Sequence, residues 1–193
     1  MLCSNKVFGG LSMALLIAGV SLWALAHWFK RLAPQLRANM GDAGKGAVAL
    51  TILGSVVLMI LGYSHAEGAF YWGRSPAMVG INNLLVLLAV YLMVASSFGS
   101  WVTGIVAHPQ LTAIKSWAVG HLLVNGDTPS FVLFGGLLAW AVISVILLNR
   151  NDGKPVRTVR TTAGREVITG VAAILVYGAI AFAHIYLGYP VFG

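Results

Sequence analysis

Several stretches of this chain are apolar for long enough to cross a lipid bilayer as helices. A spanning helix needs about 20 predominantly apolar residues, because the hydrocarbon layer is about 30 Å thick and backbone groups inside it must bond to one another. The chain is 59% hydrophobic and only 9% charged, whereas soluble domains are about 25% charged. These features predict an all-α fold, a polytopic membrane helix bundle that forms one transmembrane domain over residues 1–193.

We expect about six transmembrane helices, each bounded by polar residues, Gly or Pro. They are placed at residues 7–29, 46–64, 80–98, 109–125, 130–148 and 166–187. The first follows Lys6 and is longer than the h-region of a signal peptide, about 7–15 residues, so we expect a retained span. The fourth carries Lys115 and ends early at Asn125. It is a short span, a tilted amphipathic segment or a re-entrant helix.

The distribution of charge predicts how the chain is oriented. Residues 30–45 and 150–165 form two short loops that are rich in Lys and Arg. The cations are Lys30, Arg31, Arg37 and Lys45 in the first loop, and Arg150, Lys154, Arg157, Arg160 and Arg165 in the second. The positive-inside rule assigns both loops to the cytoplasm, so an even number of crossings must separate them. This favours a fourth segment that crosses, six spans in all, and both termini outside.

The excess of 12 Lys and Arg over 5 Asp and Glu could also suggest a nucleic-acid partner. Nucleic-acid binding needs a solvated basic face with residues that read bases, and no soluble segment here is long enough to carry one. We therefore expect no nucleic acid among the partners, and the lipid bilayer is the expected environment.

The histidines are the residues of this chain best suited to bind a metal or transfer a proton. They are His27, His65, His108, His121 and His184. Ionisable side chains at membrane depth are costly and usually face the interior for a reason, although a histidine at the end of a span, such as His184, can simply lie among the headgroups. His121 is the strongest candidate because it lies within an apolar segment, one turn after Trp117. Trp23 and His27 have the same spacing.

The other candidate chemistry is sparse. Neutral imidazole suits haem iron, because one ring nitrogen donates a lone pair while the other is held by an acceptor. The single cysteine, Cys3, excludes an internal disulfide, a cysteine-built zinc site and an iron–sulfur cluster. Asp127 follows Asn125 and Gly126, so it is either part of an ordinary tight turn or a fixed polar element of a site.

Three groups of residues carry a family resemblance. They are His108-Pro109-Gln110-Leu111, then Lys115-Ser116-Trp117-Ala118 with His121-Leu122-Leu123-Val124-Asn125-Gly126-Asp127, and finally His184 with Leu187, Gly188 and Pro190. These H-P, W-x-x-x-H and N-G-D elements, together with His27, Leu36-Arg37 and Gly41, resemble the NnrU family over nearly the whole chain. One departure is Ala107, where the family often has Arg before the H-P pair.

The resemblance implies a function and a cofactor. NnrU proteins are associated with nitrite and nitric oxide reduction in bacteria, and a relative, the zeta-carotene isomerase, uses haem b. The resemblance therefore implies haem b, with His27 and His121 as iron ligands. It also implies further cofactor-site residues, namely His108, Trp117, Asn125 and Asp127. The expected role is that of a redox or assembly factor in denitrification, in the bacterial inner membrane, with a redox partner or as a homo-oligomer.

Two alternative functions stay open, as does the question of whether the chain is an enzyme. One is a haem-dependent cis-trans isomerase of a polyene lipid such as a carotenoid. In the isomerase a cysteine three residues before the second histidine is linked to the haem site, and Ala118 stands here. The other is a membrane methyltransferase, which is expected to have paired acids near its C-terminus, and this chain has no acid after Glu166.

The proposed ligand pair sets a geometric condition. His27 is near the cytoplasmic end of the first span. A fourth span that starts at Pro109 puts His121 about 18 Å along its axis, whereas a membrane boundary near Lys115 leaves it only about 9 Å in. The second position is compatible with one iron for both histidines. His27 with His108 is the alternative pairing.

Overall fold

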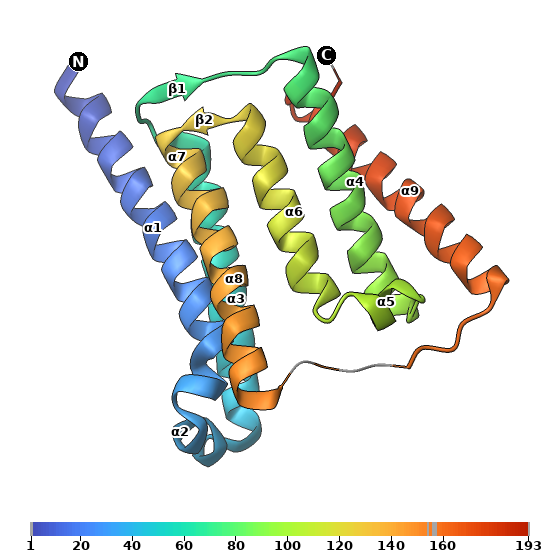
Figure 1. The fold of residues 1–193 in the computed structure, drawn as a ribbon. Coiled ribbons are helices and arrows are strands. Elements are labelled where there is room, and N and C mark those ends of the chain that lie inside the picture. The colour runs from blue at the N-terminus through green and yellow to red at the C-terminus, as the bar shows by residue number, and fades with distance from the viewer. Residues whose placement is uncertain (1, 154, 156–157, 193) are drawn as a thin grey trace. The chain divides into compact units, whose positions relative to one another are not determined.

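The chain is helical over almost its whole length in the computed structural model (Figure 1), which describes residues 2–153, 155 and 158–192 and side chains from residue 10 onward. Lys154 and Arg157 lie outside the described residues, as do the side chains of Cys3 and Lys6. The elements are α1 (Leu2–Leu32), α2 (Pro34–Asn39), α3 (Gly41–His65), β1 (Phe70–Trp72), α4 (Pro76–Phe98), α5 (Val102–Ile105), α6 (Pro109–Val124), β2 (Gly126–Asp127), α7 (Thr128–Ser130), η1 (Phe131–Gly135), α8 (Gly136–Asp152) and α9 (Ala163–Tyr186).

Five helical segments of the described chain are long and apolar enough to cross a bilayer. They are Gly10–Leu32, Gly41–His65, Pro76–Phe98, Thr128–Asp152 and Ala163–Tyr186. Most of their large apolar side chains are exposed, as lipid-facing side chains would be. The predicted all-α, multi-pass membrane fold is therefore confirmed.

The predicted count of about six spans needs one correction, at the fourth segment. Its helix, α6, begins at Pro109 as expected but has only 16 residues. At 1.5 Å per residue it is about 24 Å long, which is shorter than a hydrocarbon layer of about 30 Å. By length and composition the count of spans is thus five, and α6 is a shorter helix between them.

The described chain forms two compact units. The first contains Met1–Tyr71 and Gly126–Leu137, and the second contains Trp72–Asn125 and Leu138–Gly193. The long helical segment from Thr128 to Asp152 contributes its first residues to one unit and the remainder to the other. The prediction of one transmembrane domain over residues 1–193 stays a prediction.

In the first unit α1 and α3 pack closely along their length. Two glycines make this possible. A Cβ at Gly62 of α3 would lie 2.5 Å from the backbone nitrogen of Leu16, and a Cβ at Gly19 of α1 would lie 2.9 Å from the carbonyl oxygen of Ser55. Lipid offers no hydrophobic drive for helices to associate, so small residues that let backbones approach are a main source of packing energy.

The π-helical segment η1 and the preceding α7 also pack within the first unit. The hydroxyl groups of Tyr63 and Ser130 are 2.9 Å apart and share a hydrogen bond. The ring of Tyr63 meets Phe134 edge to face, with 5.8 Å between ring centroids. Ser130 is fully buried, so this bond satisfies a hydroxyl group that lipid could not satisfy.

In the second unit α4 packs against both α6 and α9. The contact between α4 and α6 is built around small and medium side chains, with Ala89 and Leu92 of α4 against Ala113 of α6. Ser116 of α6 donates a 2.8 Å hydrogen bond to the carbonyl oxygen of Leu85. Helices α4 and α6 lie side by side in Figure 1.

The Glu166 carboxylate connects the N-terminal end of α9 to the turn after α4 through hydrogen bonds. Glu166, in the first turn of α9, accepts hydrogen bonds from the Ser100 hydroxyl at 2.5 Å, the Thr161 hydroxyl at 2.7 Å and the Trp101 amide at 3.1 Å. Ser100 is fully buried. An acid in the first turn also complements the positive end of the helix dipole. Glu166 is therefore a structural residue.

Hydrogen bonds at both ends of α6 show that it runs from one end of the second unit to the other. His108, just before α6, is 2.8 Å from the amide oxygen of Asn149, near the end of α8. At the opposite end the Trp72 indole donates to the carbonyl oxygen of Leu122 at 3.1 Å. Helix α6 thus connects the end that carries Asn149 to the end that carries Trp72, although it is too short to be counted as a span.

A pair of glycine substitutions in α3 tests the packing of the first unit. Gly62→Ala would place a methyl group against the Leu16 backbone, and we expect a loss of about 1–3 kcal/mol in unfolding free energy from overpacking. A Cβ at Gly54 would meet no neighbouring group within 4 Å. Gly54→Ala should therefore stabilise α3 by about 0.5–1 kcal/mol. Thermal unfolding of both variants in detergent measures the difference, and equal effects would contradict close packing at Gly62.

Candidate functional site

The two Trp-x-x-x-His sequences adopt the same local geometry. In α1 the Nδ1 atom of His27 is 2.8 Å from the carbonyl oxygen of Trp23, and in α6 the Nδ1 atom of His121 is 2.9 Å from that of Trp117. In each pair the rings also contact, with centroids 4.3 Å apart in α1 and 5.0 Å apart in α6. The sequence predicted that these residues share a face, and the structure shows how they are fixed to one another.

This geometry determines which imidazole nitrogen has the lone pair. A carbonyl oxygen only accepts hydrogen bonds, so Nδ1 of His121 must donate and carry the proton. In the neutral ring Nε2 then holds the lone pair that a metal needs. Histidine ligands of metals are usually held in this way, with the other ring nitrogen donating to a backbone carbonyl or a carboxylate. His27 meets the same condition.

His184 shares the backbone contact but differs in its surroundings. Its Nδ1 atom donates to the carbonyl oxygen of Ile180 at 2.8 Å, near the end of α9. Its side chain is exposed, whereas that of His121 is half-buried. Both histidines belong to the second unit. His184 therefore serves as a comparison for His121, because it has the same Nδ1 contact but greater exposure.

His27 and His121 belong to different units, and each has a defined position in its own helix. His27 is five residues before the end of α1 at Leu32, and His121 is three residues before the end of α6 at Val124. His121 is about 18 Å along α6 from Pro109, the longer of the two distances considered from the sequence. The prediction that both imidazoles bind one iron stays a prediction.

His108, the other histidine of the predicted site, has a structural partner. It is the residue before α6 and its Nε2 atom shares a hydrogen bond with Asn149. Pro109 then occupies the first position of the helix, where the missing N–H costs nothing. The H-P pair thus starts α6 and connects it to α8. Its role as a cofactor ligand stays a prediction.

The N-G-D element ends one helix and starts the next. The side-chain amide of Asn125 donates to the carbonyl oxygen of His121 at 2.9 Å, at the C-terminal end of α6. A carboxylate oxygen of Asp127 accepts from the amide of Ser130 at 2.8 Å, which caps α7. These contacts favour the turn interpretation of Asp127. Asn125 also bonds to the same residue whose ring is proposed to bind iron.

Trp117 packs against the contact between α4 and α6. Ala118, the next residue, has no exposed surface. Because this position is filled by tight packing, a larger side chain here would disturb the contact. The structure thus gives Ala118 a packing role.

Sequence reasoning missed Asn82, which lies beside Gly120 and thus next to the His121 position. A Cβ at Gly120 would be 2.9 Å from the amide oxygen of Asn82. That oxygen is buried and has no hydrogen-bond partner within the described part of the chain. The signal was present, because the adjacent amides Asn82 and Asn83 interrupt an apolar span, where polar side chains are expensive. Asn83 donates to the carbonyl oxygen of Val191 at 3.1 Å.

An open groove at this end of the second unit does not belong to the histidine site. It is lined by Trp72, Gly73, Ser75, Met78 and Leu123. Leu123 follows His121 by two residues, and residues two apart on a helix do not share a face. The groove therefore lies on another side of α6.

The donor set also limits the kind of metal site. Among the described residues, no three His, Cys, Asp or Glu side chains lie close enough together to hold a metal ion. Haem iron takes its equatorial ligands from the porphyrin and needs only one or two axial side chains. Histidines placed singly on helices fit that requirement.

Fold and site together define a multi-pass helical membrane protein with half-buried imidazoles that donate to backbone carbonyls. The family model described as NnrU protein matches residues 15–191. The chain belongs to the NnrU family, as the H-P, W-x-x-x-H and N-G-D elements had indicated. Comparison with curated proteins and with solved structures gave no match.

Substitution of Asp127 separates a capping role from a ligand role. Asp127→Ala removes the side chain that caps α7, and we expect unfolding free energy to fall by about 1 kcal/mol. Asp127→Ser keeps an oxygen that can accept from Ser130, so it should retain most of the stability. Thermal unfolding in detergent measures both. If the serine variant is as unstable as the alanine variant, the carboxylate has a role beyond capping.

Proposed function

We propose that this NnrU-family protein binds haem b and that His121 is an axial ligand of the iron. The observation that supports this most directly is the hydrogen bond from Nδ1 of His121 to the carbonyl oxygen of Trp117. It fixes the tautomer with the lone pair on Nε2, and it fixes the direction of the ring. His184 of the same unit has a similar Nδ1 contact, but its side chain is exposed, whereas that of His121 is half-buried.

The surroundings of His121 fit a bound porphyrin in two further respects. The ring contacts Trp117, which is itself packed against α4, so the ligand is held by a rigid neighbour. Helix α6 is apolar apart from Lys115 and its short polar side chains. Haem b is a largely apolar group and is stabilised by burial among such side chains.

When bound, haem b supplies one-electron redox chemistry whose potential depends on axial ligands and burial. The part of this chain is to hold the imidazole. Trp117 provides the acceptor for Nδ1, and Asn125 donates to the carbonyl oxygen of His121 and so fixes the end of the helix that carries the ligand. Replacement of groups that support a ligand typically weakens metal binding about 10- to 100-fold.

The physiological part of the proposal rests on the family. We place the protein in the bacterial inner membrane, as a redox or assembly factor in nitrite and nitric oxide metabolism, acting with a membrane redox partner or as a homo-oligomer. The polyene isomerase and methyltransferase alternatives stay predictions, and no contact described above favours either of them.

Spectra of histidine variants test the ligand assignment. We expect a Soret band in the purified wild-type protein and loss of most of it in His121→Ala. The second ligand that the resemblance implies, His27, is tested by His27→Ala, because its ring is held in the same way. Reduced-minus-oxidised spectra, recorded at equal protein concentration, measure the haem retained and the change of ligand.

Two further histidines provide matched controls. His65 has a similar Nδ1 contact, 3.2 Å from the carbonyl oxygen of Leu61, but it is exposed at the end of α3. His65→Ala should therefore leave the spectrum unchanged. His184→Ala measures whether the neighbouring imidazole of the second unit is a ligand. A spectrum that survives His121→Ala, or a wild-type protein without a Soret band when haem is supplied, contradicts the proposal.

A further inference from the structure

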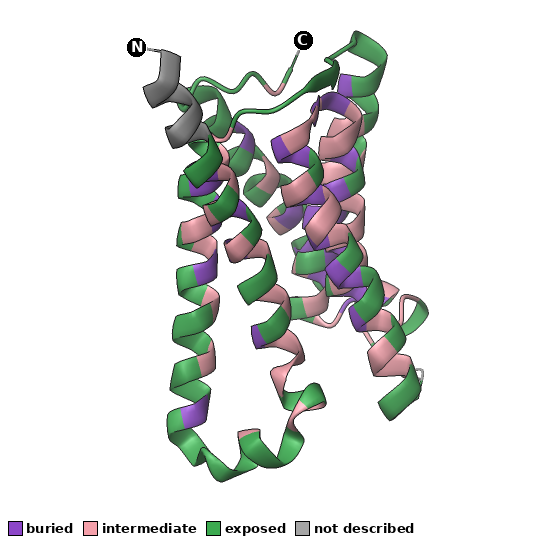
Figure 2. Ribbon diagram, turned by 90° about the vertical axis from the view of Figure 1, so that its left-hand side faces the viewer, coloured by how far each residue is buried: buried purple, intermediate pink, exposed green. Residues whose placement is uncertain are grey.

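The loop between the first two spans contains a short helix that packs against little of the protein. Helix α2 has no buried residue, and Figure 2 shows only exposed and intermediate residues along it. Three apolar side chains in and beside it, Leu32, Leu36 and Met40, are 61%, 57% and 37% exposed. Leu36 lies within α2, whereas Leu32 is the last residue of α1 and Met40 follows α2. The described protein leaves much of the surface of these three side chains uncovered.

The same loop concentrates positive charge. We call residues 30–45 the α2 hairpin. It contains Lys30, Arg31, Arg37 and Lys45 against a single acid, Asp42. Lys45 pairs with Asp42 at 2.8 Å, but both side chains are largely exposed, so water and salt screen this pair strongly. The hairpin therefore presents a net positive surface beside exposed apolar side chains.

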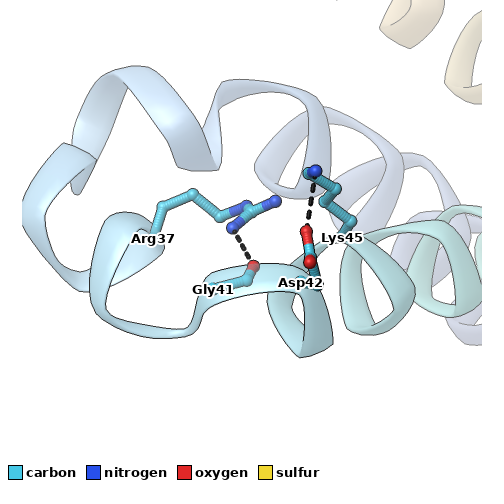
Figure 3. Close-up of polar contacts among 4 residues, drawn as sticks. All are labelled: Arg37, Gly41, Asp42 and Lys45. Carbon is cyan, nitrogen blue, oxygen red and sulfur yellow. Dashed lines mark hydrogen bonds and ion pairs between the residues drawn. The ribbon is translucent and has the colours of Figure 1, made fainter.

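The structure holds Arg37 at the surface of this hairpin (Figure 3). Its guanidinium donates to the carbonyl oxygen of Gly41 at 3.0 Å. Gly41 has a φ of +54°, a conformation that favours glycine. Gly44 lies below the guanidinium, since a Cβ there would be 2.8 Å from Nη1 of Arg37. Gly44 thus makes room for the guanidinium, whose one hydrogen bond to Gly41 uses only part of its five N–H groups.

The position of the α2 hairpin between two spans indicates which part of the bilayer it contacts. The first span ends at Leu32 and the second begins at Gly41. Residues 33–40 connect these two spans, so we expect them at the level where hydrocarbon gives way to headgroups. A short helix with apolar side chains and neighbouring cations at this depth has the composition of an interfacial membrane segment. Cations beside a span are attracted to anionic lipids of the cytoplasmic leaflet.

We propose that the α2 hairpin is a binding site for anionic phospholipids. Leu32, Leu36 and Met40 enter the acyl boundary, and Arg37 and Lys45, with Lys30 and Arg31, bind the lipid phosphates. Arginine presents a planar set of donors that matches phosphate oxygens. The positive charge complements an anionic headgroup, whereas a protein partner would have to supply both an apolar groove and acids. The proposal is independent of haem binding.

Lipid retention by charge variants tests the electrostatic part. The full-length protein is placed in nanodiscs of phosphatidylcholine with a minor fraction of phosphatidylglycerol, and retained lipid is counted by native mass spectrometry after release in detergent. Arg37→Gln with Lys45→Gln should lower phosphatidylglycerol retention roughly tenfold. The matched control, Arg150→Gln with Arg160→Gln, removes the same charge from exposed positions outside the hairpin and should have a much smaller effect. Equal losses in the two variants would overturn the proposal.

Depth measurements test the apolar part and exclude other occupants. In a Cys3→Ser background, a spin label at Leu36→Cys should lie in the lipid interface, whereas one at Ala38→Cys, about 200° around the helix, should be more accessible to water-soluble relaxants. Inorganic phosphate at matched ionic strength should not displace the retained lipid. A water-exposed label at residue 36, displacement by free phosphate, or a Leu36 label buried only when the protein is dimeric, would each reject the lipid assignment.

Discussion

Close approach between helix backbones is the constraint on which the rest of this structure depends. In lipid the apolar side chains of one helix gain nothing by leaving the bilayer for another helix, so association relies on van der Waals contact and internal hydrogen bonds. Gly62 brings α3 onto Leu16 of α1, and Gly120 brings α6 onto Asn82 of α4. At both places a single methyl group would collide with its neighbour. The positions of these helices therefore depend on glycines, which have no side chain to block the approach of the neighbouring helix.

Some features followed directly from the sequence. Apolar runs predicted the helices, Pro109 predicted the start of α6, and the Trp117–His121 spacing predicted a shared helical face. The division into two units could not be predicted, because it depends on which helices touch, and apolar composition is nearly the same in all of them. The start and end of α6 were predicted to within one residue, but a helix of 16 residues was wrongly counted as a span. Asn82 was missed because only the folded structure shows that it lies beside Gly120, the residue before His121.

The repeated Trp-x-x-x-His arrangement shows how far local sequence can specify a site. Five residues determine the acceptor of Nδ1, the tautomer and the aromatic ring that contacts the imidazole, within about one turn of helix. Which second side chain lies near His121 is decided by contacts between helices, and those contacts are not encoded in the motif. The sequence therefore indicates a ligand more reliably than it indicates a pair.

The anchoring of α9 has a consequence for the loop that precedes it. At one end Glu166 is bound by Ser100, Trp101 and Thr161, and at the other the chain after α9 is bound by Arg74 at Pro190 and by Asn83 at Val191. Since both ends of α9 are bonded to α4 or to residues beside it, the connecting segment before Thr161 need not hold α9 in place. The length and charge of that segment can therefore change in evolution without moving the last span. Such changes would alter the surface that the segment presents to other proteins.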